Sequence, residues 1–235
     1  MHAEQRRVAD DGLHYLVIFP DDYDADADYP LVVMLHGFGA NMQDLAGLAP
    51  SINRKGYVYV CPNAPIPFEL APGMIGYGWH PPRGQATKEH FDQAESLLDA
   101  FFAEVLSEFR AQQDRAVLLG FSQGGGMTYR MGLERADKFV ALVALSASLP
   151  DPEILRPRLP DHREQPVFVA HGLYDQMVSM DSARRTREFL DAENYNLSYH
   201  EYNMGHEIPV EVLRDMVPWM EALLPPLVAE TDRIF

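Results

Sequence analysis

The chain has 235 residues, 47% of them hydrophobic, and its 35 acidic against 19 basic side chains give a net charge of −16 at pH 7. This length and apolar content predict a single globular domain, residues 1–235, with a sizeable core. So acidic a chain should repel nucleic acid and anionic membrane surfaces, so we expect neither a nucleic-acid partner nor membrane insertion.

Cysteine usage and the ends of the chain indicate a compartment. The single cysteine, Cys61, excludes an intramolecular disulfide and is expected to be an inert core thiol. Residues 1–10 are polar without the apolar stretch of a signal peptide, and no apolar run approaches membrane-spanning length. These features predict a cytoplasmic protein, with residues 225–235 as a flexible tail.

Apolar runs alternate with helical patterns along the chain. The runs that predict strands are residues 13–19, 31–35, 57–61, 116–121, 139–146, 167–171 and 196–202. The longest helical pattern, residues 88–110, has one apolar stripe that is typical of a helix facing the core. This alternation predicts an α/β fold, a mostly parallel central sheet with helices on both faces.

Two segments in the first half of the chain are candidates for contact with a ligand. The run 31–35 ends in His36-Gly37-Phe38-Gly39, where the glycines let the backbone approach a substrate closely. Residues 64–84 predict a long irregular connection, rich in Pro, Gly and apolar side chains that include Met74 and Trp79. These side chains either pack the connection onto the sheet or, with Phe38 opposite, wall a small apolar pocket.

The most informative motif is Gly120-Phe121-Ser122-Gln123-Gly124, a G-x-S-x-G sequence between an apolar run and a helical pattern. In this strand–turn–helix context the motif predicts a nucleophile elbow that presents the Ser122 hydroxyl at the top of the sheet. The alternative is a glycine-rich turn whose serine only caps the following helix.

A nucleophilic serine needs a base and an orienting acid, which follow it in the order acid, then histidine, in hydrolases of this type. His206 lies in a loop between a strand pattern and a helix pattern and is the leading base; His162, His171 and His200 suit solvated or strand positions. Asp175 follows the run 167–171 and is the leading acid, with Asp181 as the alternative.

The same mechanism requires two backbone N–H groups for the oxyanion. One is expected from Gln123, the residue after the nucleophile, and the other from Phe38 in the loop after the early strand. The sequence carries no H-E-x-x-H, C-x-x-C or P-loop pattern, so no metal or cofactor is expected.

These motifs, together with Pro62-Asn63-Ala64-Pro65, His171-Gly172-Leu173-Tyr174-Asp175-Gln176-Met177-Val178 and Met204-Gly205-His206, resemble the phospholipase/carboxylesterase family of α/β-hydrolases. The resemblance implies the α/β-hydrolase fold and a cofactor-free serine esterase with Ser122, Asp175 and His206 as its triad. The candidates for binding of a small-molecule ester substrate are Phe38, Met74, Trp79 and Met177. A homodimer stays open.

The sequence departs from the family pattern at two places near the expected substrate site. Trp79 is followed by His80-Pro81-Pro82, where the family often has a second aromatic residue and an aspartate, and Phe38 stands where leucine is common. These departures concern the substrate and leave the reaction class unchanged. A small pocket walled by side chains of residues 64–84 would favour short acyl groups, so we expect an esterase for short-chain carboxylic esters. The alternatives are an acyl-protein thioesterase or lysophospholipase, a peptidase or lactone hydrolase, and a non-catalytic binding protein on the same scaffold.

Overall fold

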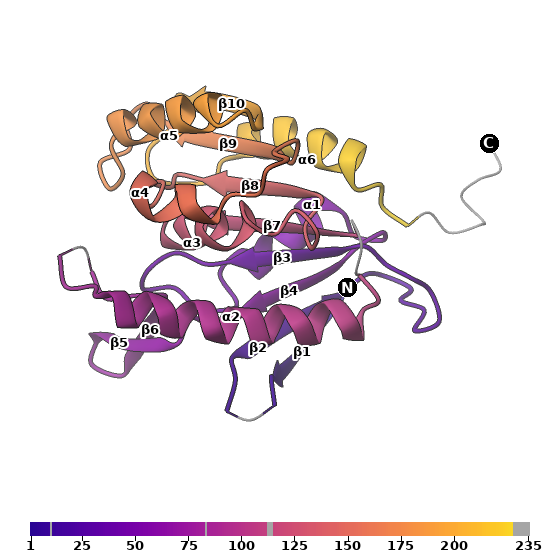
Figure 1. Ribbon diagram of the computed structural model, residues 1–235. Helices are drawn as coiled ribbons and strands as arrows, with labels where there is room; N and C mark the ends of the chain where they lie inside the picture. Colours follow the sequence, from indigo (N-terminus) through magenta and orange to yellow (C-terminus); the bar gives the residue numbers. More distant parts are fainter. Residues whose placement is uncertain (10, 83, 112–114, 228–235) are drawn as a thin grey trace.

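One central sheet of eight strands organises the protein, in the order β1-β2-β4-β3-β7-β8-β9-β10 (Figure 1). The computed structural model describes residues 1–9, 11–82, 84–111 and 115–227. The strands of this sheet are β1 (His2–Arg7), β2 (His14–Phe19), β3 (Leu31–Leu35), β4 (Val58–Pro62), β7 (Ala116–Phe121), β8 (Ala141–Leu145), β9 (Pro166–Gly172) and β10 (Asn196–Tyr202). The pairs β1–β2 and β2–β4 are antiparallel, and the pairs from β4 to β10 are parallel.

Helices cover both faces of this sheet, as the alternating pattern predicts. The helices are α1 (Ala49–Ile52), α2 (Lys88–Glu108), α3 (Gln123–Gly132), α4 (Pro152–Leu155), α5 (Met180–Ala192) and α6 (Val210–Leu223), with 3₁₀ turns η1 (Leu45–Leu48) and η2 (Arg156–Arg158). The fold is the α/β class expected from the sequence.

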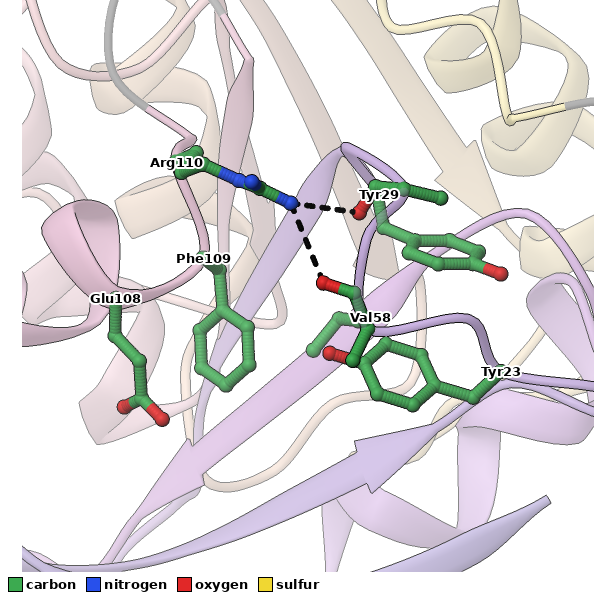
Figure 2. Close-up of a pocket in the computed structure, with 8 residues that line it drawn as sticks. Tyr23, Tyr29, Val58, Glu108, Phe109 and Arg110 are labelled. Carbon is green, nitrogen blue, oxygen red and sulfur yellow. Dashed lines mark hydrogen bonds between the residues drawn. The ribbon is translucent and has the colours of Figure 1, made fainter.

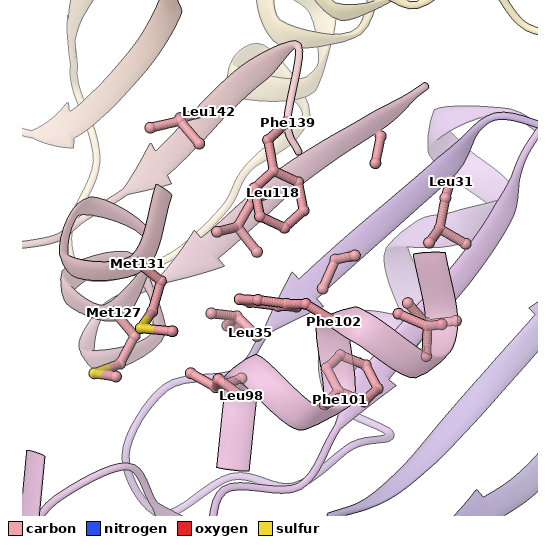
Figure 3. Packing of buried hydrophobic residues seen from close by; sticks show 14 of the residues in the cluster. Leu31, Leu35, Leu98, Phe101, Phe102, Leu118, Met127, Met131, Phe139 and Leu142 are labelled. Atoms are coloured by element: carbon pink, nitrogen blue, oxygen red, sulfur yellow. The ribbon is translucent and has the colours of Figure 1, made fainter. Parts of the chain in front are cut away.

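The two faces of the sheet carry separate cores. Alternate residues of β3 divide between them, because successive strand side chains point to opposite faces. Leu31 and Leu35 pack with Phe102 of α2 and with Leu118 of β7 (Figure 3), whereas Met34 belongs with the α6 side chains on the other face. Helices therefore pack against both faces of the central strands. This packing fixes the positions of the loops that follow these strands.

Strand β1 escapes prediction because its residues, His-Ala-Glu-Gln-Arg-Arg, carry no apolar run. It lies at the edge of the sheet and is paired only with β2, in a register that places His2 opposite Phe19. An edge strand whose side chains are mostly exposed needs no buried face, so burial leaves no mark on its sequence.

Residues 64–84 differ from the irregular connection expected. They include an antiparallel hairpin of β5 (Ile66–Ala71) and β6 (Met74–Gly78), which forms a separate two-stranded sheet. Gly73 takes a φ of 77° at the turn, a conformation that favours glycine. A two-stranded hairpin gains little stability by itself, so its contacts with the neighbouring loop, described below, hold it in place.

The end of the described chain is attached to the sheet. The Leu227 N–H donates a hydrogen bond of 2.9 Å to the carbonyl of Gly56, just before β4. The first residues of the expected flexible tail therefore have a fixed partner, and residues 228–235 lie outside the described part of the chain.

Candidate active site

Ser122 lies in the sharp turn between β7 and α3, with φ 55° and ψ −117°. This backbone conformation is strained for a residue with a side chain. The surrounding chains approach so closely that a Cβ on Gly120 would overlap the Gly124 carbonyl, and one on Gly124 would overlap the Leu35 carbonyl. The two glycines of the motif therefore allow the turn to form against the end of β3.

A chain of hydrogen bonds connects the three residues that the sequence singles out. Ser122 Oγ lies 2.9 Å from His206 Nε2, and His206 Nδ1 lies 2.7 Å from Asp175 Oδ2. Ser122 follows β7, Asp175 follows β9 and His206 follows β10. The carboxyl ends of these parallel strands lie at the same end of the sheet. The imidazole of His206 also packs on the ring of Phe121, with centroids 4.8 Å apart.

The Asp175 carboxylate is buried and held by the backbone. Its Oδ1 accepts hydrogen bonds of 2.8 Å from the N–H groups of Met177 and Val178. Burial raises the pKa of Asp175, but the hydrogen bonds from Val178, His206 and Met177 outweigh burial and place the pKa below its ordinary value. The ionised carboxylate therefore accepts the Nδ1–H of His206, which leaves the Nε2 lone pair facing Ser122.

The other candidates lie elsewhere. Asp181 is exposed in the first turn of α5, and His162 is exposed as well. His200 stacks on Phe168 within the sheet. His171 is fully buried beside the acid: its Nε2 donates to the Val178 carbonyl at 2.8 Å and lies 3.5 Å from Asp175 Oδ2. His171 thus supports the loop that contains Asp175. Its place at the end of a strand did not by itself predict this contact.

The glycine-rich loop after β3 borders Ser122. A Cβ added to Gly37 would lie 3.3 Å from the Cβ of Ser122, so this backbone passes directly beside the turn that contains Ser122. Gln123 is the first residue of α3, and its N–H has no carbonyl partner within the helix. The structure thus places Gly37, which precedes Phe38, and Gln123 beside Ser122.

His36 braces this loop from within the core. Its Nδ1 donates to the Gly37 carbonyl at 2.7 Å, and its Nε2 accepts from the Ala64 N–H at 3.0 Å. Burial lowers the pKa of His36 to about 4, although the hydrogen bond to Gly37 opposes the shift. The ring is therefore neutral near pH 7, with each nitrogen committed to one backbone partner.

A cavity of about 230 Å³ lies away from this site (Figure 2). It is lined by Tyr23, Tyr29, Phe109 and Arg110 among others, and the Arg110 guanidinium donates to the carbonyls of Ala25 and Ala27. Because Tyr29 precedes β3 and Val58, another lining residue, begins β4, the cavity adjoins the amino ends of the strands. The cavity therefore lies at the end of the sheet where the parallel strands begin, whereas Ser122 lies at the end where they terminate.

Comparisons with known proteins identify the family of this chain. The model of the family described as Phospholipase/Carboxylesterase matches residues 22–224. The chain belongs to the phospholipase/carboxylesterase family. It is 28% identical to acyl-protein thioesterase 1 of Neurospora crassa over 221 residues, covering 86% of this chain and 90% of that relative.

Solved structures of similar proteins superpose on most of the chain. Esterase PE8 matches with a TM-score of 0.77 and 26% identity, covering 88% of this chain and 97% of its own. The Bacillus cereus carboxylesterase matches with a TM-score of 0.75 and 19% identity, over 91% and 96% of the two chains, and so shares the fold. The chain is therefore a hydrolase of the esterase and thioesterase type.

The residues expected to bind substrate in this family member divide into two groups. The side chains of Phe38, Met74 and Met177 are 41%, 59% and 77% exposed, so they stay candidates for contact with a substrate. Trp79 is fully buried, and its indole N–H donates to the His36 carbonyl at 2.9 Å. The expectation that Trp79 walls a pocket is wrong for this conformation, because its side chain packs beneath the loop after β3.

No group of three or more His, Cys, Asp or Glu side chains is arranged to hold a metal ion in the described ranges. Nor do those ranges include a helix of sufficient length and apolarity to traverse a lipid bilayer.

Close packing at the elbow predicts opposite effects for two neighbouring glycines. Gly124→Ala should destabilise the protein by about 1–3 kcal/mol, because the new methyl group overlaps the Leu35 carbonyl. Gly126→Ala is the matched control: its Cβ would lie 3.4 Å from the Ser148 carbonyl, an ordinary contact, and alanine favours the helix. Urea unfolding measures both, and equal stabilities of the two variants would contradict the packing argument.

His36 predicts a pH dependence of stability. Its folded pKa, about 4, lies below the ordinary histidine value of about 6.5, so the unfolded chain binds more protons between these pH values. This part of the stability is complete above about pH 6.5 and is lost as the pH falls towards 4.

Urea unfolding of the wild type and of His36→Gln at pH 7 and pH 5 tests this prediction. The wild type should lose about 1–2 kcal/mol more than the variant between the two pH values, at about 1.4 kcal/mol per unit of pKa shift. Because other titrating groups are common to both proteins, parallel losses would show that His36 is not the source.

Proposed function

We propose that the protein is a serine esterase for short-chain carboxylic esters, with Ser122 as nucleophile, His206 as general base and Asp175 as the acid that orients the base. The observation that carries this proposal is the unbroken hydrogen-bond chain, 2.9 Å and 2.7 Å long at its two links, from the Ser122 hydroxyl to a buried carboxylate. A histidine oriented in this way can accept the serine proton during attack.

The proposed reaction begins when Ser122 Oγ attacks the ester carbonyl carbon while His206 Nε2 takes the hydroxyl proton. The carbonyl oxygen becomes an oxyanion, which the N–H groups of Phe38 and Gln123 stabilise. The tetrahedral intermediate then collapses: the bond to the alcohol oxygen breaks, and His206 returns the proton to that oxygen.

Deacylation repeats these steps with water. His206 removes a proton from a water molecule as the water oxygen attacks the acyl-enzyme, and the second tetrahedral intermediate releases the carboxylic acid. Ser122 recovers its proton from His206. Throughout, the Asp175 carboxylate stabilises the imidazolium without taking its proton.

Thioester hydrolysis is a second candidate, favoured by relatives that are named acyl-protein thioesterase 1. The acylation step differs only in the leaving group, which is a thiolate in place of an alkoxide. A thiolate departs with less help from His206. Comparison of kcat/KM on phenyl butyrate and S-phenyl thiobutyrate separates the two candidates, since the acyl group is identical in both substrates.

Substitution of the three residues tests the mechanism. Ser122→Ala and His206→Ala should each lower kcat for p-nitrophenyl acetate by about 10³-fold or more, and Asp175→Asn should also be severe because it misorients the base. Circular dichroism verifies that each variant is folded. Near-wild-type hydrolysis by Ser122→Ala would rule out this mechanism, and absence of turnover by the wild type on esters and thioesters would favour the binding-protein alternative.

The exposed apolar side chains around the site predict the range of acyl chains. The Phe38 side chain is 41% exposed, so we expect each methylene of a short acyl group to gain at most about 0.8 kcal/mol from contact with it, and a longer acyl chain to extend into water. We expect kcat/KM to be highest for acyl chains of about two to six carbons in a series of p-nitrophenyl esters.

Phe38→Ala keeps the backbone N–H and removes the ring, so it should penalise hexanoate more than acetate. Val210→Ala serves as the control, since Val210 is an exposed apolar residue, 61% accessible, at the start of α6. An optimum at twelve carbons or more in the wild type would contradict the short-chain proposal.

A further inference from the structure

The side chain of Gln123 makes hydrogen bonds that the proposed chemistry does not require. Its Oε1 accepts from the backbone N–H of Trp79 at 2.7 Å, and its Nε2 donates to the carbonyl of His80 at 2.9 Å. Both ends of the amide are thus committed to the two residues that follow β6. The first residue of α3 is thereby tied to the hairpin.

The same hairpin is also bonded to the loop after β3. The Gly39 N–H donates to the Tyr77 carbonyl and the Tyr77 N–H donates to the Ala40 carbonyl, each at 2.8 Å. Two residues further on, the Trp79 indole donates to the His36 carbonyl at 2.9 Å. These bonds hold the chain on both sides of Phe38.

Packing fixes this short segment, Tyr77 to His80, on two more sides. A Cβ on Gly78 would lie 2.9 Å from the ring of Phe38, so the strand already touches that side chain. The His80 ring packs on Phe91 of α2 with centroids 4.6 Å apart, and the guanidinium of Arg130 also lies over the Phe91 ring, 4.6 Å from its centroid. These contacts therefore restrict the movement of the segment from Tyr77 to His80.

We propose that the Gln123 side chain is a positioning residue that sets the spacing between the two oxyanion donors, the N–H groups of Phe38 and Gln123. The donors belong to different elements, a loop and a helix, and the segment from Tyr77 to His80 is bonded to both. The inference rests on the proposed function, since it concerns the oxyanion site of that reaction. Stabilisation of an oxyanion needs donors placed within about 0.5 Å, so loss of this connection reduces the rate.

Two substitutions test the connection without removing the backbone N–H of residue 123. Gln123→Leu removes both hydrogen bonds, whereas Gln123→Glu keeps an acceptor for the Trp79 N–H and loses the donor to His80. On p-nitrophenyl acetate, kcat should fall by about 10–100-fold for Gln123→Leu and by less for Gln123→Glu, with KM within about threefold of wild type, because the loss concerns the transition state.

Gln165→Leu is the matched control. Gln165 is also buried and its amide donates to a backbone carbonyl, that of Phe139, at 2.7 Å, but it lies before β9 and away from Ser122. It should lower stability and leave kcat unchanged. An equal fall of kcat in Gln165→Leu would show that the effect of Gln123 reflects general destabilisation.

Amide hydrogen exchange provides a readout that does not depend on activity. In Gln123→Leu, and to a smaller extent in Gln123→Glu, the backbone around Trp79 should exchange faster than in wild type, while the Gln165→Leu variant keeps wild-type exchange there. Unchanged exchange around Trp79, or faster exchange with unchanged kcat, would overturn the proposal. Full activity of Ser122→Ala would instead reject the proposed function, and the exchange data would still decide whether Gln123 holds the segment.

Discussion

The contact between the first turn of α3 and the end of β3 determines the rest of the site. Gly124 rests against the carbonyl groups of Leu35 and His36, the residues that lead into the loop around Phe38. One close approach therefore places Ser122, the Gln123 N–H and the loop after β3 relative to one another. The strained backbone of Ser122, φ 55°, persists because the strands and helices around it are packed on both faces of the sheet.

The remaining polar groups are positioned by the backbone more than by other side chains. Two amides hold Asp175, a carbonyl holds His171, and a carbonyl and an amide hold His36. Backbone partners have few alternative positions in a packed fold, so each side chain keeps one orientation and, for His36, one protonation state. In a chain with a net charge of −16, burial still lowers the pKa of His36 to about 4, so this imidazole is neutral near pH 7 although its hydrogen bond to Gly37 opposes the shift.

The sequence predicts those parts of the structure that burial or local chemistry makes recognisable in the pattern of residues. The buried strands were predictable from continuous apolar runs, and the half-buried β10 was predictable from the alternation of polar and apolar residues over 196–202. Asp175 and His206 were predictable because each follows a strand whose end lies at the same edge of the sheet. Strand β1 leaves no apolar signal, and the hairpin was hidden among prolines and glycines. The orientation of Trp79 was not predictable, since an indole suits an open pocket and a buried brace equally well until its N–H partner is known.

The hairpin of β5 and β6 presents exposed apolar side chains and also makes backbone hydrogen bonds to the loop after β3. Its outward side chains Leu70, Met74 and Ile75 are about half exposed, whereas its backbone at Tyr77 is bonded to the loop that carries Phe38. An acyl group that packs on those side chains would restrict the strand bonded to this loop, in which the Phe38 N–H is the proposed oxyanion donor. Binding energy from a remote part of a substrate raises kcat when it is realised only in the transition state. Acyl-chain preference in this enzyme should therefore be expressed in kcat as well as in KM, which distinguishes a hairpin coupled to the oxyanion site from a passive apolar wall.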